Sequence, residues 1–134
     1  VDGTLSITGN SISSLGTLYL QNSILAENID LFNGKVTIDK EGNIVTTGSI
    51  TTTQLKIQEN TSAGTFTLEA GKTEAVIENK FVTEKSIVLV TSSVPLSQTI
   101  GVSEKITGKS FKVVLKQAED KDIQIDYIII DRTN

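Results

Sequence analysis

Short runs of alternating apolar and polar residues fill the first half of the chain. Three of them begin with glycine: Gly-Thr-Leu-Ser-Ile at 3–7, Gly-Thr-Leu-Tyr-Leu at 16–20 and Gly-Lys-Val-Thr-Ile at 34–38. A period of two predicts strands that each bury one face. Three further short strands are expected, at 44–46, 49–51 and 54–57.

The segment from Gln21 to Phe32 fits two patterns. Its apolar residues share one helical face, but Asn22, Asn28 and Asp30 oppose a regular helix. The strand-and-turn interpretation is favoured, and a helix is the alternative.

The second half has longer and cleaner alternation. Glycine-centred turns at 70–72 and 107–109 predict hairpins. Six strands with short connections and no helix predict a compact antiparallel β-sandwich or barrel. The strands are expected at 65–70, 73–78, 86–92, 99–104, 110–116 and 123–130. The expected core consists of Ile87, Leu89, Phe111, Val113, Ile123, Ile125 and Tyr127.

A shift in charge density divides the chain. Residues 1–64 carry 3 Lys and 6 Asp or Glu, whereas residues 65–134 carry 9 Lys or Arg and 10 Asp or Glu. The polar, turn-rich stretch 58–64 lies between them and is typical of a junction. We expect a β-repeat shaft over 1–64 and an antiparallel β-sandwich head or cap over 65–134.

The predicted shaft is too thin to bury its own apolar faces. About 60 residues of one-sided strands need at least three stacked units with capping ends. Three chains around a common axis would bury these faces in a β-prism or triple-β-helix-like shaft, so we expect a homotrimer. A single-chain solenoid and a globular arrangement are the alternatives. The predicted subunit interface consists of Leu18, Leu20, Ile29, Leu31, Val36, Ile38, Ile44, Ile50, Leu55 and Ile57.

The amino-acid composition excludes most of the side chains that catalyse reactions. The chain has no His, Cys, Met or Trp, so it offers no imidazole base, thiol nucleophile, disulfide or soft metal ligand. Serine is abundant, but without histidine a catalytic triad cannot form. We expect a protein that is not an enzyme, with no catalytic site, no cofactor and no metal site.

The charge balance also limits the partners. A net charge of −4 and a pI near 4.8 argue against nucleic acid and anionic membranes as binding partners, because both bind basic surface patches. No apolar run approaches the roughly 20 residues that span a bilayer. The chain opens on Val-Asp-Gly, and we interpret it as a piece of a larger or processed protein.

Three groups of acidic residues are candidate sites. Asp39–Asn43 lacks the spacing of a calcium loop and predicts a hairpin turn with Gly42 in the left-handed region. Glu69 with Glu74, and the acids of 119–122, are interpreted as solvated edge charges rather than a glycosidase pair. A Lys–Asn isopeptide crosslink would need a buried Lys, Asn and acid that spacing alone cannot place together.

Several motifs resemble a known family. They are Ala-Gly-Lys-Thr-Glu-Ala-Val-Ile at 70–77, Val-Ser-Glu-Lys at 102–105, Gly-Lys-Ser-Phe-Lys-Val at 108–113 and Asp-Ile-Gln-Ile-Asp-Tyr-Ile-Ile-Ile at 122–130. They resemble the C-terminal β-domain, with its preceding β-repeats, of surface or fibre proteins from candidate-phyla (Patescibacteria-type) bacteria. The first half more loosely resembles trimeric phage tail-fibre shafts.

This resemblance implies location and assembly rather than chemistry. It implies an extracellular or cell-surface protein, or a virion tail fibre. The family's last strand often carries aromatic residues where this chain has Ile125 and Ile128, which argues against an aromatic ligand platform.

Two functions are expected from these observations. The first is a structural and attachment module, the C-terminal part of a homotrimeric cell-surface or fibre protein. Its partners would be other copies of itself and a host-surface glycan or protein, with no nucleic acid and no membrane contact by this fragment. The alternative is a monomeric carbohydrate- or protein-binding β-sandwich module of an extracellular protein.

Overall fold

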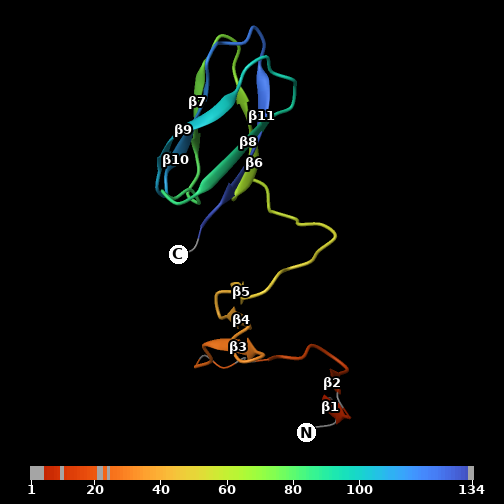
Figure 1. Ribbon diagram of the computed structural model, residues 1–134. Helices are drawn as coiled ribbons and strands as arrows, with labels where there is room; N and C mark the ends of the chain where they lie inside the picture. The colour runs from red at the N-terminus through yellow and green to blue at the C-terminus, as the bar shows by residue number, and fades with distance from the viewer. Residues whose placement is uncertain (1–4, 10, 21–22, 24, 133–134) are drawn as a thin grey trace. The chain divides into compact units, whose positions relative to one another are not determined.

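The computed structural model describes residues 5–9, 11–20, 23 and 25–132, and over these residues the chain is built from strands without a helix (Figure 1). The predicted all-β class is therefore confirmed. Nothing in the described part of the chain forms a helix suited to crossing a membrane.

Two compact units make up the chain, Val1–Thr53 and Gln54–Asn134. The charge pattern of the sequence puts the boundary after residue 64. In the structure the second unit begins earlier, at Gln54. Ser62 O, for example, accepts a hydrogen bond from Ile129 N–H at 2.6 Å.

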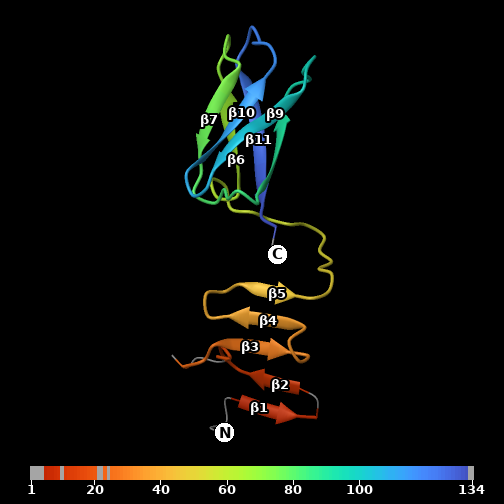
Figure 2. The same cartoon turned by 60° about the vertical axis from the view of Figure 1, so that its left-hand side comes forward.

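The first unit contains two small antiparallel sheets. One pairs β1 (Leu5–Thr8) with β2 (Ser11–Ser14). The other is a three-stranded meander, visible in Figure 2, of β3 (Asn28–Leu31), β4 (Val36–Asp39) and β5 (Ile44–Thr46). The strand-and-turn interpretation of 21–32 is confirmed at β3, while residues 21, 22 and 24 lie outside the described residues.

The turn between β4 and β5 is the hairpin expected at Asp39–Asn43. Gly42 has a φ of +85°, a backbone conformation that is strained for residues with a Cβ. Asp39 closes the turn, because its carboxylate accepts hydrogen bonds from Asn43 N–H and from Asn43 Nδ2, both at 2.8 Å.

The second unit contains six strands in two three-stranded antiparallel sheets. One sheet has the order β7-β10-β9 and the other β6-β11-β8. The last two strands of the chain are thus the central ones. The strands are β6 (Ala63–Leu68), β7 (Glu74–Glu78), β8 (Ile87–Ser92), β9 (Ile100–Ile106), β10 (Ser110–Leu115) and β11 (Ile123–Ile130).

The two central strands supply most of the core between these sheets. Alternate residues of β10 and β11 are buried, as a strand with one face on a core requires. Five of the seven predicted core residues are confirmed as buried: Phe111, Val113, Ile123, Ile125 and Tyr127.

The prediction for the other two core residues is wrong. Ile87 and Leu89 are 42% and 52% exposed, whereas Val88 and Val90 pack against the core. Residues 87–90 are all apolar, so this run contains no alternation from which the buried face could be identified.

The predicted hairpin at 70–72 is also wrong. The turn is present, with Lys72 N–H donating to Glu69 O at 3.1 Å, but it carries the chain from β6 in one sheet to β7 in the other. The predicted hairpin at 107–109 is confirmed, since β9 and β10 are antiparallel neighbours.

Three predicted strands of the repeat region do not form. Residues 16–20, 49–51 and 54–57 have no strand assignment. A strand needs a neighbouring strand to pair with, and none of the four sheets of the described chain includes these segments.

Candidate functional site

The three-stranded sheet of the first unit has one apolar and one polar face. Cross-strand partners share a face, and the register aligns Ile29 with Ile38 and Ile44, and Leu31 with Val36. We call these five residues the apolar sheet face. The opposite face carries Asn28, Asp30, Thr37, Asp39 and Val45.

The described side chains of the first unit do not bury this apolar sheet face. Ile29, Val36 and Ile38 are half-buried, and Leu31 and Ile44 are exposed. No side chain that the structure describes between residues 9 and 53 is buried. The sheet is therefore a single layer, whereas stable domains bury apolar faces between at least two layers.

The predicted interface residues separate into two groups. The apolar sheet face unites Ile29, Leu31, Val36, Ile38 and Ile44, and Leu20 lines a small hollow together with Ile29 and Ile38. The remaining residues are not brought together on one strand surface: Leu18 and Ile50 lie in irregular segments of the first unit, and Leu55 and Ile57 belong to the second unit.

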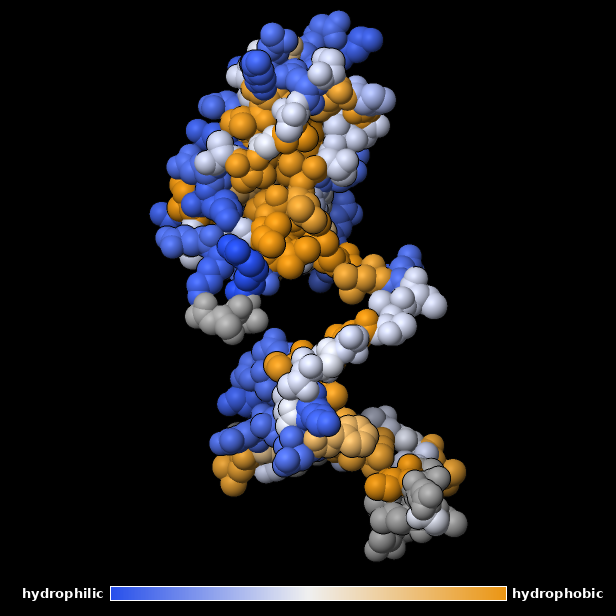
Figure 3. All heavy atoms as spheres, in the orientation of Figure 1, coloured by the Kyte–Doolittle hydropathy of each residue, from blue (hydrophilic) through white to orange (hydrophobic). Residues whose placement is uncertain are grey.

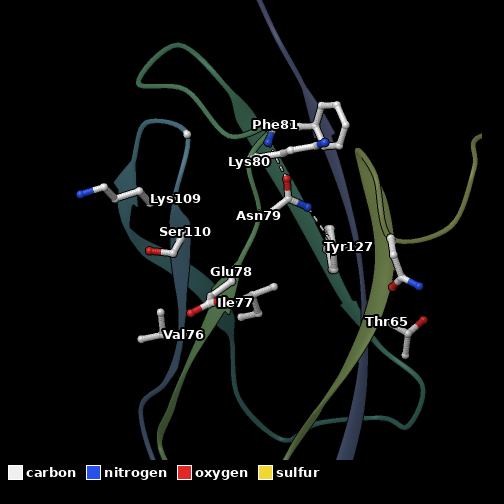
Figure 4. A pocket seen from close by; sticks show the side chains of 12 residues that line it. Thr65, Val76, Ile77, Glu78, Asn79, Lys80, Phe81, Lys109, Ser110 and Tyr127 are labelled. Carbon is white, nitrogen blue, oxygen red and sulfur yellow. Dashed lines mark hydrogen bonds between the residues drawn. The ribbon is translucent and has the colours of Figure 1, made fainter.

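A groove that the sequence did not predict lies in the second unit, between β6 and β7. Its volume is about 800 Å³. Figure 4 shows Ile77 and Tyr127 pointing into the space between the two strands, with Phe81 and Lys80 at one end. The assumed hairpin at 70–72 would have paired β6 with β7 and closed this gap.

Asn79 organises one end of the groove. Its Nδ2 donates to Thr61 O at 2.7 Å and lies 3.2 Å from Tyr127 Oη, while its Oδ1 accepts from Phe81 N–H at 2.8 Å. Asn79 is buried, so these bonds satisfy an amide that would be costly to leave unpaired. Lys80 Nζ lies 5.3 Å from the centre of the Phe81 ring.

Strand β7, beside the groove, has one edge that pairs with no strand in the described part of the chain. Thr73 O accepts a hydrogen bond from Leu115 N–H of β10, and Asn79 N–H donates to Lys109 O, just before β10. Since antiparallel residues alternate in direction, the N–H and C=O groups of Glu74, Val76 and Glu78 point away from β10. In the described chain β7 has no second strand neighbour.

A polar cluster joins the end of β11 to the loop before β8. The Asp131 carboxylate accepts hydrogen bonds from Ser86 Oγ and from Thr83 Oγ1, the latter at 2.8 Å. These bonds, the Ser86 bond first, and the charge of Lys105 hold the pKa of Asp131 below its ordinary value of 3.8. Lys105 Nζ itself donates to the carbonyls of Glu84 and Ser86.

This cluster predicts a pH dependence. A lowered folded pKa means that the Asp131 bonds stabilise the folded chain above pH 3.8 and are lost as the pH falls through the folded value. Asp131→Asn should lower the urea midpoint of the second unit at neutral pH. When the pH is then lowered, the midpoint of this variant should fall less than that of the unaltered chain. Asp120→Asn, an exposed change of equal charge, is the control, and equal pH profiles for the two variants would contradict the assignment.

The other acidic groups brace turns. Asp122 Oδ1 accepts from Ala70 N–H at 2.8 Å, and Glu119 Oε1 accepts from Gln98 Nε2 at 2.8 Å. The Asn43 bonds to Asp39 lower the pKa of that carboxyl. Within the described ranges, no three His, Cys, Asp or Glu side chains gather as metal ligands. A Lys–Asn crosslink would need a buried Lys beside a buried Asn. Buried Asn79 bonds to Thr61, Phe81 and Tyr127, whereas half-buried Lys105 donates to the carbonyls of Glu84 and Ser86.

The outer face of the β6-β11-β8 sheet carries an apolar patch. The register places Ile87 beside Ile130 and Leu89 beside Ile128, and all four point away from the core. Figure 3 shows apolar side chains gathered on this part of the second unit. The outer face of the other sheet is charged instead, with Lys112 Nζ 3.8 Å from Glu74 and 3.6 Å from Glu104.

Comparison of the chain with protein-family models, with curated proteins and with solved structures finds no match. The site itself therefore has to support any functional conclusion.

Proposed function

We propose that the chain is a structural and attachment module, part of a homotrimeric fibre or cell-surface protein. The first unit acts as the shaft and the second as the head. The observation that carries this proposal is the apolar sheet face of a single-layer sheet, which no described side chain of the first unit buries. Burying such an aliphatic side chain would contribute at most about 1.5–3 kcal/mol, and less for Ile29, Val36 and Ile38, which are already half-buried. The loose resemblance of the first half to trimeric phage tail-fibre shafts favours three copies.

Adjacent residues of β5 provide the test. Ile44 and Val45 are 62% and 59% exposed in the single chain, but Ile44 lies on the apolar sheet face and Val45 on the opposite face. Ile44→Asp should abolish association, and Val45→Asp should preserve it. Ile38→Asp should act like Ile44→Asp and more strongly, because Ile38 is central in the sheet.

Light scattering measures the outcome as absolute mass. The unaltered chain should have a mass near three times 14.4 kDa, and the Ile44 variant a mass near one chain. A monomeric unaltered chain, or equal masses for the two β5 variants, would refute the shaft assignment.

The head would then carry the attachment function, with a host-surface glycan or protein as its target and an extracellular or virion location. The resemblance of the motifs to surface and fibre proteins supports this part of the proposal. The groove beside β7, with exposed Phe81, favours one second candidate, a monomeric binding module. The same mass measurement separates the two.

A further inference from the structure

We propose that Asn33–Gly34, in the turn between β3 and β4, is a site of spontaneous deamidation, and that the carboxylate of Asp30 restrains the reaction. The only co-reactant is water. The chemistry is therefore independent of any association between copies of the chain.

The reaction uses the backbone of the turn itself. The Gly34 nitrogen gives up its proton and attacks Asn33 Cγ, and the side-chain nitrogen leaves as ammonia, which carries that proton away. Water then opens the five-membered imide at either of its two carbonyls. One product has aspartate at this position. The other has isoaspartate, in which the backbone runs through the former side-chain carbonyl.

Asn33 is singled out by the residue that follows it. Of all the asparagines in the chain, it alone precedes a glycine. Glycine has no Cβ to shield its nitrogen. The described asparagines elsewhere are followed by residues with larger side chains, Ile29, Ile44, Thr61 and Lys80.

The turn needs this reactive pair and leaves room around it. Asn33 and Gly34 have φ angles of +56° and +80°, the left-handed conformation that Asn-Gly pairs adopt readily in tight hairpin turns. Both residues are exposed, and a Cβ placed on Gly34 would meet no atom within 4 Å. Water can therefore reach the pair, and an imide ring would meet no neighbouring side chain at Gly34.

Asp30 acts on the step that removes the proton. Gly34 N–H donates a hydrogen bond to Asp30 Oδ1 at 2.6 Å, and this is the proton that has to leave before the attack. A charged acceptor makes the bond stronger than a neutral one would. The nitrogen anion that forms next would also be repelled by the neighbouring carboxylate. Asp30 is thus a restraining residue that takes no part in the bonds made and broken.

The isoaspartate product would alter the first unit. The turn joins Leu31 to Val36, which are opposite each other in the β3–β4 register. Loop length fixes the register of a hairpin, and isoaspartate adds one carbon to the backbone of this loop. The product would therefore disturb the pairing that aligns the apolar sheet face, whereas the aspartate product keeps the backbone length.

Mass spectrometry of the full chain tests the site. The unaltered chain is incubated in mildly alkaline buffer, samples are digested at intervals, and tandem spectra locate the residue that exchanges its amide nitrogen for oxygen. Asn33 should show this exchange before any other asparagine. If another asparagine reacts first, Asn33 is not the site and the inference is overturned.

Two charge-removing variants test the restraint. Asp30→Asn keeps an oxygen that can accept from Gly34 N–H but removes the negative charge. Deamidation at Asn33 should become about fivefold faster, which corresponds to about 1 kcal/mol of lost repulsion. Asp39→Asn is the matched control, because Asp39 holds the next turn through Asn43, and it should leave the rate at Asn33 unchanged.

Hydrogen exchange separates the charge effect from opening of the turn. The backbone amides of Leu31 and Val36 should exchange at the same rate in the Asp30→Asn variant as in the unaltered chain. An equal or slower deamidation rate in that variant would overturn the restraint by Asp30. Faster deamidation accompanied by faster exchange of these amides would also overturn it, because an opened turn would then be the cause.

Discussion

Replacing Phe111 by alanine should unfold the second unit. Phe111 is 1% exposed on central strand β10, and its ring packs edge-on against Tyr127 with centroids 5.2 Å apart. Truncating a buried Phe costs about 3–5 kcal/mol, including the cavity that it leaves. A unit of this size has a total stability of the same order, so little would remain.

Lys112→Ala is the matched control on the same strand. Lys112 points to the outer face, where its side chain is 28% exposed and its two glutamate partners are 59% and 53% exposed, so its loss should cost about 1 kcal/mol. Urea unfolding followed by hydrogen exchange of β10 and β11 peptides reports on this unit separately. Similar midpoints for the two variants would mean that the buried face of β10 is assigned wrongly.

The Gly64→Ala substitution should also be strongly destabilising, although it adds only one methyl group. A Cβ at Gly64 would lie 2.7 Å from Tyr127 Oη and 3.0 Å from the ring carbon that bears it. Tyr127 has little room to move away, because it contacts Phe111 on one side and Asn79 Nδ2 lies 3.2 Å from its hydroxyl. Such overpacking typically costs about 1–3 kcal/mol.

Gly101→Ala is the control, since a Cβ at Gly101 meets no atom within 4 Å. Its urea midpoint should equal or exceed that of the unaltered chain. Adding Tyr127→Phe to Gly64→Ala removes the closest contact, and the two changes should therefore be non-additive by at least about 0.5 kcal/mol. Additive effects would contradict steric conflict as the cause.

The alternation of apolar residues predicted the second unit most accurately where it was longest. Residues 123–130 form β11 with the predicted bounds, and the strand at 110–116 differs from β10 only at its end. β10 and β11 are the middle strands of their sheets. One face of each therefore lies against the core, whichever strands pair with it. At β8 the four consecutive apolar residues from Ile87 to Val90 do not alternate, so the sequence does not identify the buried face.

The pairing of strands was not predictable in the same way. Residues 49–51 and 54–57 have strand-like sequences, but a strand also depends on a neighbour that alternation does not identify. The groove was missed for the same reason: the turn at Gly71 fits a hairpin and a connection between sheets equally well. Five of the ten predicted interface residues share a face because β3, β4 and β5 are consecutive, the simplest pairing to infer.

The position of the central strands has a consequence for how the chain folds during synthesis. The ribosome completes β6, β7, β8 and β9 before β10 and β11, yet the sheet pairings of all four require one of those later strands. The four earlier strands must therefore wait as unpaired, aggregation-prone segments. Contacts between β6 and β11 span most of the second unit's sequence, and such long-range closure slows folding. A ribosome pause or a premature stop before Ile123 would leave one of the two sheets without its centre.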